Sequence, residues 1–245
     1  MKARSWLTAT ALVAVLAPGV ARAQGVEGRF SIAFQGGTQS EIAGDLITGA
    51  QGTLVGKPAT IDSKSYRDIY APDLRLQGQL GYGIGPKVEI FGRGTYYKAN
   101  GTAVEGGTFN GHPLFIFFDP YGEYEEVGFE VGLRYYIAST GRLKSYIAPV
   151  AGARFLSEVL VSFSVPDAGT SVQNIPFNAE STVAVFGLDL GFTFDLGEHF
   201  FVGVDSGLRY QTAPKQFDEL EGLTKVDDSE SRWSAPVVAS IGVRF

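Results

Sequence analysis

Charged side chains recur at every second position along several stretches of this chain, and they are the first candidates for chemistry. The bases among them are all arginine, whereas the lysines beyond residue 23 fall in connections or at the ends of the stretches. Arginine stays charged and can bind carboxylates through a planar fork, so this sorting indicates a confined ion-pair network. The predicted network consists of Glu27, Arg29, Arg75, Glu89, Arg93, Glu126, Glu130, Arg134, Arg154, Asp189, Asp195, Asp205, Arg209 and Arg244.

Histidine offers a second kind of chemistry. His112 has Asp119 and Glu123 nearby in the sequence, but no serine stands at a spacing that would orient it, and His199 lies in a short connection. One histidine with scattered carboxylates also lacks the spacing of a metal site. The absence of cysteine excludes disulfide-stapled and cysteine-rich zinc domains. We therefore predict no catalytic residue, no metal and no cofactor.

The charged positions belong to eight segments in which apolar and polar residues alternate strictly. In the clearest one, Val127, Phe129 and Val131 share one face, and Glu130 and Arg134 share the other. A period of two predicts strands. Segments of about ten residues have the length of a tilted transmembrane strand. The eight segments are 26–35, 73–84, 88–97, 127–137, 146–155, 184–196, 200–210 and 233–245.

Short and long connections alternate between these segments. The short ones, at 85–87, 139–142 and 197–199, are rich in turn residues, and the long ones are 36–69, 99–123, 157–181 and 211–231. Outer-membrane barrels have this rhythm, whereas a soluble sandwich has no reason to lengthen every second loop. The sequence predicts an all-β fold, a closed antiparallel up-and-down transmembrane β-barrel of eight strands. A ten-stranded barrel, with a further hairpin around Thr53-Leu54-Val55, is the alternative.

The N-terminus predicts export. Lys2 and Arg4 precede an apolar stretch over 6–17, and Ala21-Arg22-Ala23 fits a cleavage site. The apolar stretch is shorter than the roughly 20 residues that span a bilayer. We expect a secretory signal peptide over 1–23 and the barrel domain over 24–245. The formal net charge of −6 argues against nucleic acid as a partner.

The ending Val237-Val238-Ala239-Ser240-Ile241-Gly242-Val243-Arg244-Phe245, together with the leader and the strand rhythm, gives a family resemblance. The chain resembles small eight-stranded outer-membrane barrels of the OmpA, OmpX and OmpW type. In that family the barrel-assembly machinery recognises a last strand that closes on a terminal aromatic residue. The resemblance implies an assembly signal of Phe245, Val243 and Ile241. It also implies location in the outer membrane, with its lipid, lipopolysaccharide and the assembly machinery as partners.

Three functions remain open at this point. A structural or surface-interaction role, exercised through the long loops with a lumen plugged by the arginine–carboxylate network, is the first. A narrow channel for small or hydrophobic solutes is the second. An outer-leaflet lipid-modifying enzyme, a lipid A hydrolase or acyltransferase using His112, is the third. The segment Pro113-Leu114-Phe115-Ile116-Phe117-Phe118-Asp119-Pro120 is either a strand extension packed against other loops or an exposed patch that binds lipid or a partner.

Overall fold

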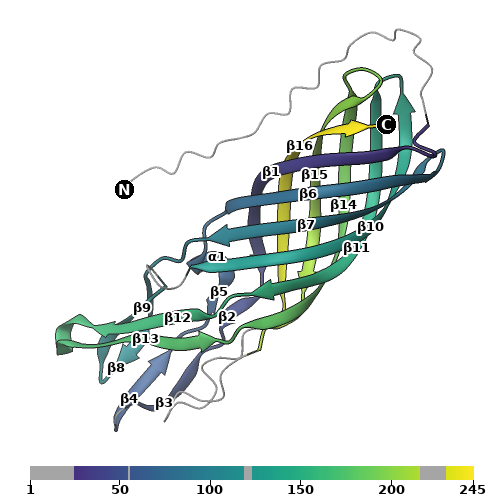
Figure 1. Cartoon of the computed structure of the whole chain (residues 1–245). Coiled ribbons are helices and arrows are strands. Elements are labelled where there is room, and N and C mark those ends of the chain that lie inside the picture. Colours follow the sequence, from purple (N-terminus) through teal and green to yellow (C-terminus); the bar gives the residue numbers. More distant parts are fainter. Residues whose placement is uncertain (1–24, 55, 119–122, 216–229) are drawn as a thin grey trace.

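The fold is a closed antiparallel barrel continued at one end by a second sheet (Figure 1). The computed structural model describes residues 25–54, 56–118, 123–215 and 230–245, so the predicted signal peptide lies outside the described residues. The barrel has the spatial order β1-β16-β15-β14-β11-β10-β7-β6, which confirms the eight-stranded prediction. Its strands are β1 (Phe30–Ala43), β6 (Asp73–Gly85), β7 (Val88–Ala99), β10 (Tyr124–Thr140), β11 (Leu143–Leu156), β14 (Ser181–Asp195), β15 (Phe200–Gln211) and β16 (Arg232–Arg244).

The barrel strands carry apolar side chains outward and polar side chains inward. On β14, for example, Phe186 and Leu190 are 52% and 55% exposed, whereas Asp189 between them is buried. Successive side chains of a strand point to opposite faces, so strict alternation in sequence becomes two faces of opposite polarity. This barrel is therefore apolar outside and charged inside.

Closure joins the first strand to the last. Ile32 on β1 lies opposite Val243 on β16, and Phe34 lies opposite Ile241. The closure extends past β16, because Phe30 and Phe245 exchange two backbone hydrogen bonds of 2.8 and 3.0 Å. The turns at this end of the barrel, which we call the short-turn end, are tight. Gly141 in the β10–β11 turn has a φ of 60°, a conformation that glycine adopts without steric cost.

The predicted long loops contain strands of their own. At the end opposite the short turns, a six-stranded sheet has the order β13-β12-β9-β8-β4-β3, and β2 pairs with β5 beside it (Figure 1). We call the six-stranded sheet the second sheet. The elements of this region are β2 (Asp45–Ile47), β3 (Ala50–Leu54), β4 (Lys57–Ile61), β5 (Lys64–Ser65), α1 (Tyr66–Ile69), β8 (Val104–Phe109), β9 (His112–Phe117), β12 (Val159–Val165), the 3₁₀ turn η1 (Pro166–Ala168) and β13 (Thr170–Asn178).

The ten-stranded alternative is wrong. The hairpin near Thr53 exists as β3 and β4, but β4 pairs with β8 in the second sheet, with Thr60 opposite Thr108, and not with a barrel strand. Each of these two strands has only 5 residues. Crossing a bilayer takes about 9–11 residues per strand, so a hairpin of this length cannot join the barrel wall. Val55, the last residue of the predicted hairpin, lies outside the described residues.

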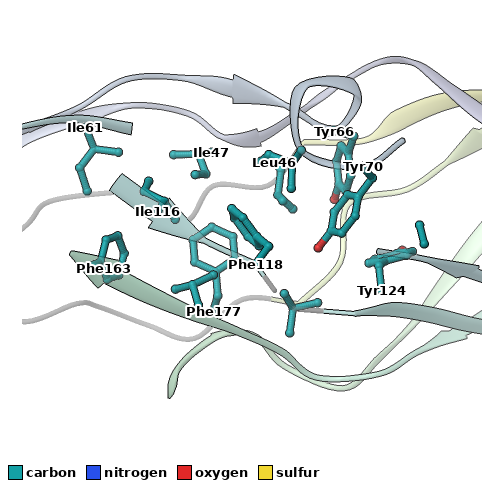
Figure 2. Packing of buried hydrophobic residues seen from close by; sticks show 14 of the residues in the cluster. Leu46, Ile47, Ile61, Tyr66, Tyr70, Ile116, Phe118, Tyr124, Phe163 and Phe177 are labelled. Atoms are coloured by element: carbon teal, nitrogen blue, oxygen red, sulfur yellow. The ribbon is translucent and has the colours of Figure 1, made fainter. Parts of the chain in front are cut away.

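The second sheet and its neighbouring segments enclose an apolar core. Leu46, Ile61, Phe163 and Phe177 converge in this core with the aromatic rings of α1 and β10 (Figure 2). The apolar run at 113–118 contributes Leu114, Ile116 and Phe118, which are all buried. For these three residues the structure therefore shows packing, whereas Asp119 and Pro120 of the predicted segment lie outside the described residues. No helix in the described part of the chain is long and apolar enough to cross a membrane.

Candidate functional site: the charged barrel lumen

Strand alternation places the charges of the lumen at fixed levels. Glu126, Glu130 and Arg134 stand four residues apart on β10, so all three point inward. Glycines between charged positions make room for long side chains. A Cβ at Gly187 would lie 2.6 Å from Cδ of Arg209, which is closer than real side chains approach. Glycine at this position therefore leaves the inward volume free for an arginine.

The carboxylate of Glu130 is the centre of the network. Nε and Nη2 of Arg93 donate to its Oε2 at 2.8 and 2.5 Å. Its Oε1 lies 3.3 Å from Nη2 of Arg75 and 3.2 Å from Nη2 of Arg154. Nη2 of Arg209 lies 3.3 Å from Oε2. All five side chains are buried, and the four arginines come from β6, β7, β11 and β15. One buried carboxylate therefore ties together strands from around the barrel.

A second acid extends this centre across the lumen. Oδ2 of Asp189 lies 2.8 Å from Nη2 of Arg93, and its Oδ1 lies 2.7 Å from Nη1 of Arg209. A cavity lined by these three residues, with Gln77, Asp205 and Val238 among its neighbours, has no room for a water molecule. At this level the lumen is filled by side chains, as expected for a barrel of eight strands.

The short-turn end of the lumen holds a separate group of ion pairs. Glu89 accepts hydrogen bonds from the hydroxyls of Tyr136 and Ser31 at 2.7 and 2.8 Å, and its Oε1 lies 3.3 Å from Nη1 of Arg134. The guanidinium of Arg134 also lies 4.2 Å from the ring centre of Tyr146. Such a cation–π contact is strengthened where water is excluded.

Asp195 joins two cations nearest to the short turns. Nζ of Lys144 lies 2.7 Å from its Oδ2, and Nη1 of Arg244 lies 3.1 Å from its Oδ1. Lys144 is buried, so a lysine takes part in a network whose predicted bases were all arginine. The sequence could have indicated this role, because Lys144 is separated by two and four residues from Tyr146 and Ala148, whose side chains also point inward from β11.

The opposite end of the lumen meets the apolar core. Nη1 of Arg154 donates to Glu126 at 2.6 Å, and Arg232 forms a further ion pair with Glu126. Arg232 also lies 3.5 Å from Glu41, and its guanidinium stands 5.0 and 4.6 Å from the ring centres of Tyr66 and Tyr124. Arg232 therefore links the charged lumen to the aromatic side chains of the core.

Three of the predicted network residues have other surroundings. Glu27 is exposed, because β1 begins only at Phe30 and residues 26–29 form a turn in which Gly28 has a φ of 71°. Arg29 donates to the backbone oxygens of Glu198 and Arg244 at 2.5 and 3.1 Å. Asp205 is buried as predicted, but its hydrogen-bond donor is Nε2 of Gln35, at 3.0 Å.

The other predicted members come together in the lumen. They are Arg75, Glu89, Arg93, Glu126, Glu130, Arg134, Arg154, Asp189, Asp195, Arg209 and Arg244. Sequence reasoning missed Glu41 and Arg232, which lie on β1 and β16 beyond the predicted strand ends. It also missed the buried glutamines that serve as neutral partners. One of these is Gln39, which donates to Glu41 at 3.0 Å and accepts from Arg75.

The histidines occupy the two ends of the molecule. His112 begins β9, its side chain is 45% exposed, and its Nδ1 lies 3.7 Å from Oδ2 of Asp167. Nδ1 of His199 lies 3.1 Å from the backbone oxygen of Arg244. In the described residues, none of these contacts involves a serine, and no group of three or more histidine or acidic side chains could hold a metal.

No protein-family model and no curated protein sequence matches the chain. Among solved structures it is similar to the outer membrane protein OprG of Pseudomonas aeruginosa, with 14% identity, coverage of 91% of this chain and 98% of that chain, and a TM-score of 0.46. It is also similar to Neisserial surface protein A, with 15% identity, coverage of 89% of this chain and 100% of that chain, and a TM-score of 0.44. A third similar structure is that of Ail, the attachment invasion locus protein of Yersinia pestis. It has 14% identity, coverage of 89% of this chain and 99% of that chain, and a TM-score of 0.39. What the chain shares with these proteins is a likeness in fold.

Proposed function

We propose that this chain is an integral outer-membrane protein whose lumen is closed by ion pairs and whose role is structural or surface interaction. The observation that carries the proposal is the carboxylate of Glu130, which binds arginines from four strands around the barrel. The signal peptide at 1–23 would export the chain. No nucleic acid enters this role.

The outward face supports a bilayer as the surrounding solvent. Large apolar side chains cover it, among them Phe200 on β15 and Ile241 on β16. A soluble monomer rarely exposes a contiguous apolar area of this kind, because contact with water is unfavourable. In lipid the exposure of this apolar face carries no free-energy penalty. Closure of the barrel pairs the backbone N–H and C=O groups of every barrel strand with those of its neighbours. Short turns belong on the periplasmic side, so the second sheet stands outside the cell.

Conductance tests the closed lumen. Purified barrel in a planar bilayer should show no large steady conductance, because the cavity beside Asp189, Arg93 and Arg209 leaves no room for water. Glu130→Ala should produce a leak, since it removes the carboxylate that holds four guanidiniums. Asp205→Asn, a nearly isosteric change in the same lumen, is the control and should stay closed. A large steady conductance of the unchanged protein would refute the plug and favour the narrow channel.

Assembly is the second part of the proposal. The backbone of Phe245 binds that of Phe30 on the first strand, and its side chain is exposed on the outward face. We propose that Phe245, Val243 and Ile241 form the signal that the barrel-assembly machinery reads. Deleting Phe245 should lower the yield of heat-modifiable barrel in outer membranes far more than shortening the β12–β13 hairpin does. Equal yields would contradict this assignment.

Surface interaction would belong to the second sheet. Its strands derive from three of the predicted long loops, 36–69, 99–123 and 157–181, whereas 216–229 of the loop at 211–231 lie outside the described residues. The apolar core gives these strands a fixed arrangement, so they offer a preformed surface to lipopolysaccharide or to a partner. Replacing 104–117 by a short turn should abolish surface binding and leave barrel insertion intact.

A further inference from the structure

The barrel closes where its first strand meets its last, and we call the pairing of β1 with β16 the seam. Every other pair of neighbouring barrel strands is consecutive along the chain and shares a turn or loop, whereas β1 and β16 share none. The chain ends beside the start of β1 (Figure 1), and chain ends fray unless something ties them down. Non-covalent contacts alone must therefore hold the seam at the short-turn end.

Arg29 reaches across the seam. Its backbone oxygen accepts a hydrogen bond from the N–H of Gly83, on β6, at 3.0 Å. Its Nη2 donates to the backbone oxygens of Arg244 and Glu198 at 3.1 and 2.5 Å. The spatial order of the strands is β6-β1-β16-β15-β14, and Glu198 lies in the turn between β14 and β15. One residue therefore connects elements on both sides of the seam.

His199 binds the same peptide group from the side of the turn. The N–H of Arg244 donates to the backbone oxygen of His199 at 2.6 Å, and Nδ1 of His199 lies 3.1 Å from the backbone oxygen of Arg244. A carbonyl oxygen can only accept, so we assign the proton of this second hydrogen bond to Nδ1. The two lone pairs of the carbonyl oxygen accommodate both His199 and Arg29.

The side chain of Arg244 is held as well. Its Nη1 lies 3.1 Å from Oδ1 of Asp195, and its guanidinium lies 4.8 Å from the ring centre of Phe201. The acceptors of Arg29 lie 169 and 215 positions away along the chain. These two hydrogen bonds can form only when β1, β16 and the β14–β15 turn have come together, so they follow closure of the barrel.

We propose that Arg29 and His199 form a latch, which closes over the seam once β16 has paired with β1 and keeps the last strand from parting at the short-turn end. The proposal rests on the proposed function for its setting, in which this end stands in the periplasm. Strand ends in water can exchange their backbone hydrogen bonds for bonds to water. In hydrocarbon an opened strand finds no such partners. The latch therefore acts where the seam opens most easily.

Hydrogen exchange at the seam tests the latch. The parent barrel, Arg29→Ala and His199→Ala are folded into phospholipid vesicles, and amide exchange over 238–245 is followed by mass spectrometry. Arg142→Ala is the matched control, because Arg142 is an exposed arginine of the β10–β11 turn at the same end of the barrel. Its backbone oxygen accepts from the N–H of Asp195 at 2.9 Å, a bond that the substitution leaves in place.

We expect the amides of Arg244 and Phe245 to exchange about tenfold faster in both latch variants, the change produced by losing roughly one hydrogen bond. Exchange in the β10–β11 hairpin should stay as in the parent. His199→Asn should recover the protection, because its side-chain amide places an N–H donor on the same Cγ. Unchanged seam exchange in both alanine variants, an equal increase in Arg142→Ala, or no recovery in His199→Asn would overturn the latch.

The latch and the proposed function fail differently. If the parent neither inserts into vesicles nor shifts on a heat-modifiability gel, the membrane barrel itself is refuted. If every variant inserts and shifts but seam exchange does not respond, the latch alone is refuted. His199→Ala keeps every backbone hydrogen bond of its turn and removes one donor, so it carries the test should Arg29→Ala not fold.

Discussion

The barrel lumen and the apolar core beneath the second sheet place polarity in opposite ways, and the barrel strand β7 reaches both. In the barrel part of β7, Glu89 and Arg93 point inward and Ile90 points outward. Farther along the same strand, Tyr97 and Ala99 point into the apolar core, whereas Lys98 is on the outer side and pairs with Glu123 at 2.6 Å. The inward face changes from charged to apolar within one strand. On the proposed function, the level of Tyr96 and Tyr97 is where the surroundings of the outward face change from lipid to water.

This inversion shows that the surrounding solvent decides which side chains are buried, whether they are charged or apolar. In water, apolar side chains gain by leaving the surface, and the core around Phe118 is the result. In lipid, apolar side chains gain nothing by turning inward, so charged groups occupy the lumen and neutralise one another. Specific ion pairs hold one region together, and hydrophobic packing holds the other.

The largest effect should come from the centre of the lumen. Glu130→Ala leaves the buried guanidiniums of Arg75, Arg93, Arg154 and Arg209 without their shared carboxylate. Removing one partner of buried ion pairs costs about 3–5 kcal/mol. Urea unfolding from lipid vesicles should show this loss in the free energy of unfolding. A loss below about 1 kcal/mol would mean that the ion pairs do not stabilise the barrel.

A charge on each exposed surface compares the two solvents directly. Ile241→Arg places a guanidinium on the outward face of β16 and should cost about 2–4 kcal/mol near the middle of the membrane. Thr108→Arg, on an exposed position of β8 in the second sheet, should change stability by less than about 0.5 kcal/mol. The same unfolding measurement checks both. Equal costs would show that the two exposed faces share one solvent.

A single methylene gives a smaller contrast. Ile116→Val removes one methylene from the apolar core and should cost about 0.5–1.5 kcal/mol in the unfolding of the second sheet. Ile241→Val, at a lipid-facing position, should cost less, because lipid fills the space that the side chain leaves. Susceptibility of the second sheet to protease measures the effect of Ile116→Val. A loss of stability in Ile241→Val alone would contradict our assignment of the two regions.

The smallest effect is expected at His112. Its side chain is half exposed and its acidic neighbour Asp167 lies 3.7 Å away, so His112→Ala should change stability by less than about 0.5 kcal/mol. It should also leave the lipid A of expressing cells unchanged relative to cells with the parent protein. Modified lipid A that disappears only with this variant would favour the lipid-modifying enzyme over the structural role.

The barrel strands could be predicted from sequence because lipid and lumen impose opposite polarity on alternate residues. The same alternation of polar and apolar residues predicted strands that are shorter than those in the structure. Toward the second sheet the outward residues of β1 become small or polar, so the alternation ends there. Glu41 on β1 and Arg232 on β16 therefore lie outside the alternating segments, although they keep the inward parity. Which arginines meet at Glu130 depends on the register across closed strands, and no single segment encodes it.

The second sheet was harder to predict for a related reason. Its strands are short, and register shifts interrupt the pairing of β8 with β9 and of β12 with β13. Prolines at 58, 113 and 176 stand within its strands and resemble turn signals. The apolar run ending at Phe118 carried the one sequence signal of packing, and the structure shows its alternate residues in the core.

The closure of β1 against β16 sets the order of events in synthesis. Arg29 and the backbone oxygen of Arg244 form a hydrogen bond across 215 positions of the chain. Such distant pairing must overcome the entropy of closing a very long loop, and folding rates fall as the separation of contacting residues grows. The barrel cannot complete its wall until β16 has been made. Closure therefore follows the end of synthesis, and on the proposed function the apolar strands depend until then on factors that keep them from aggregating.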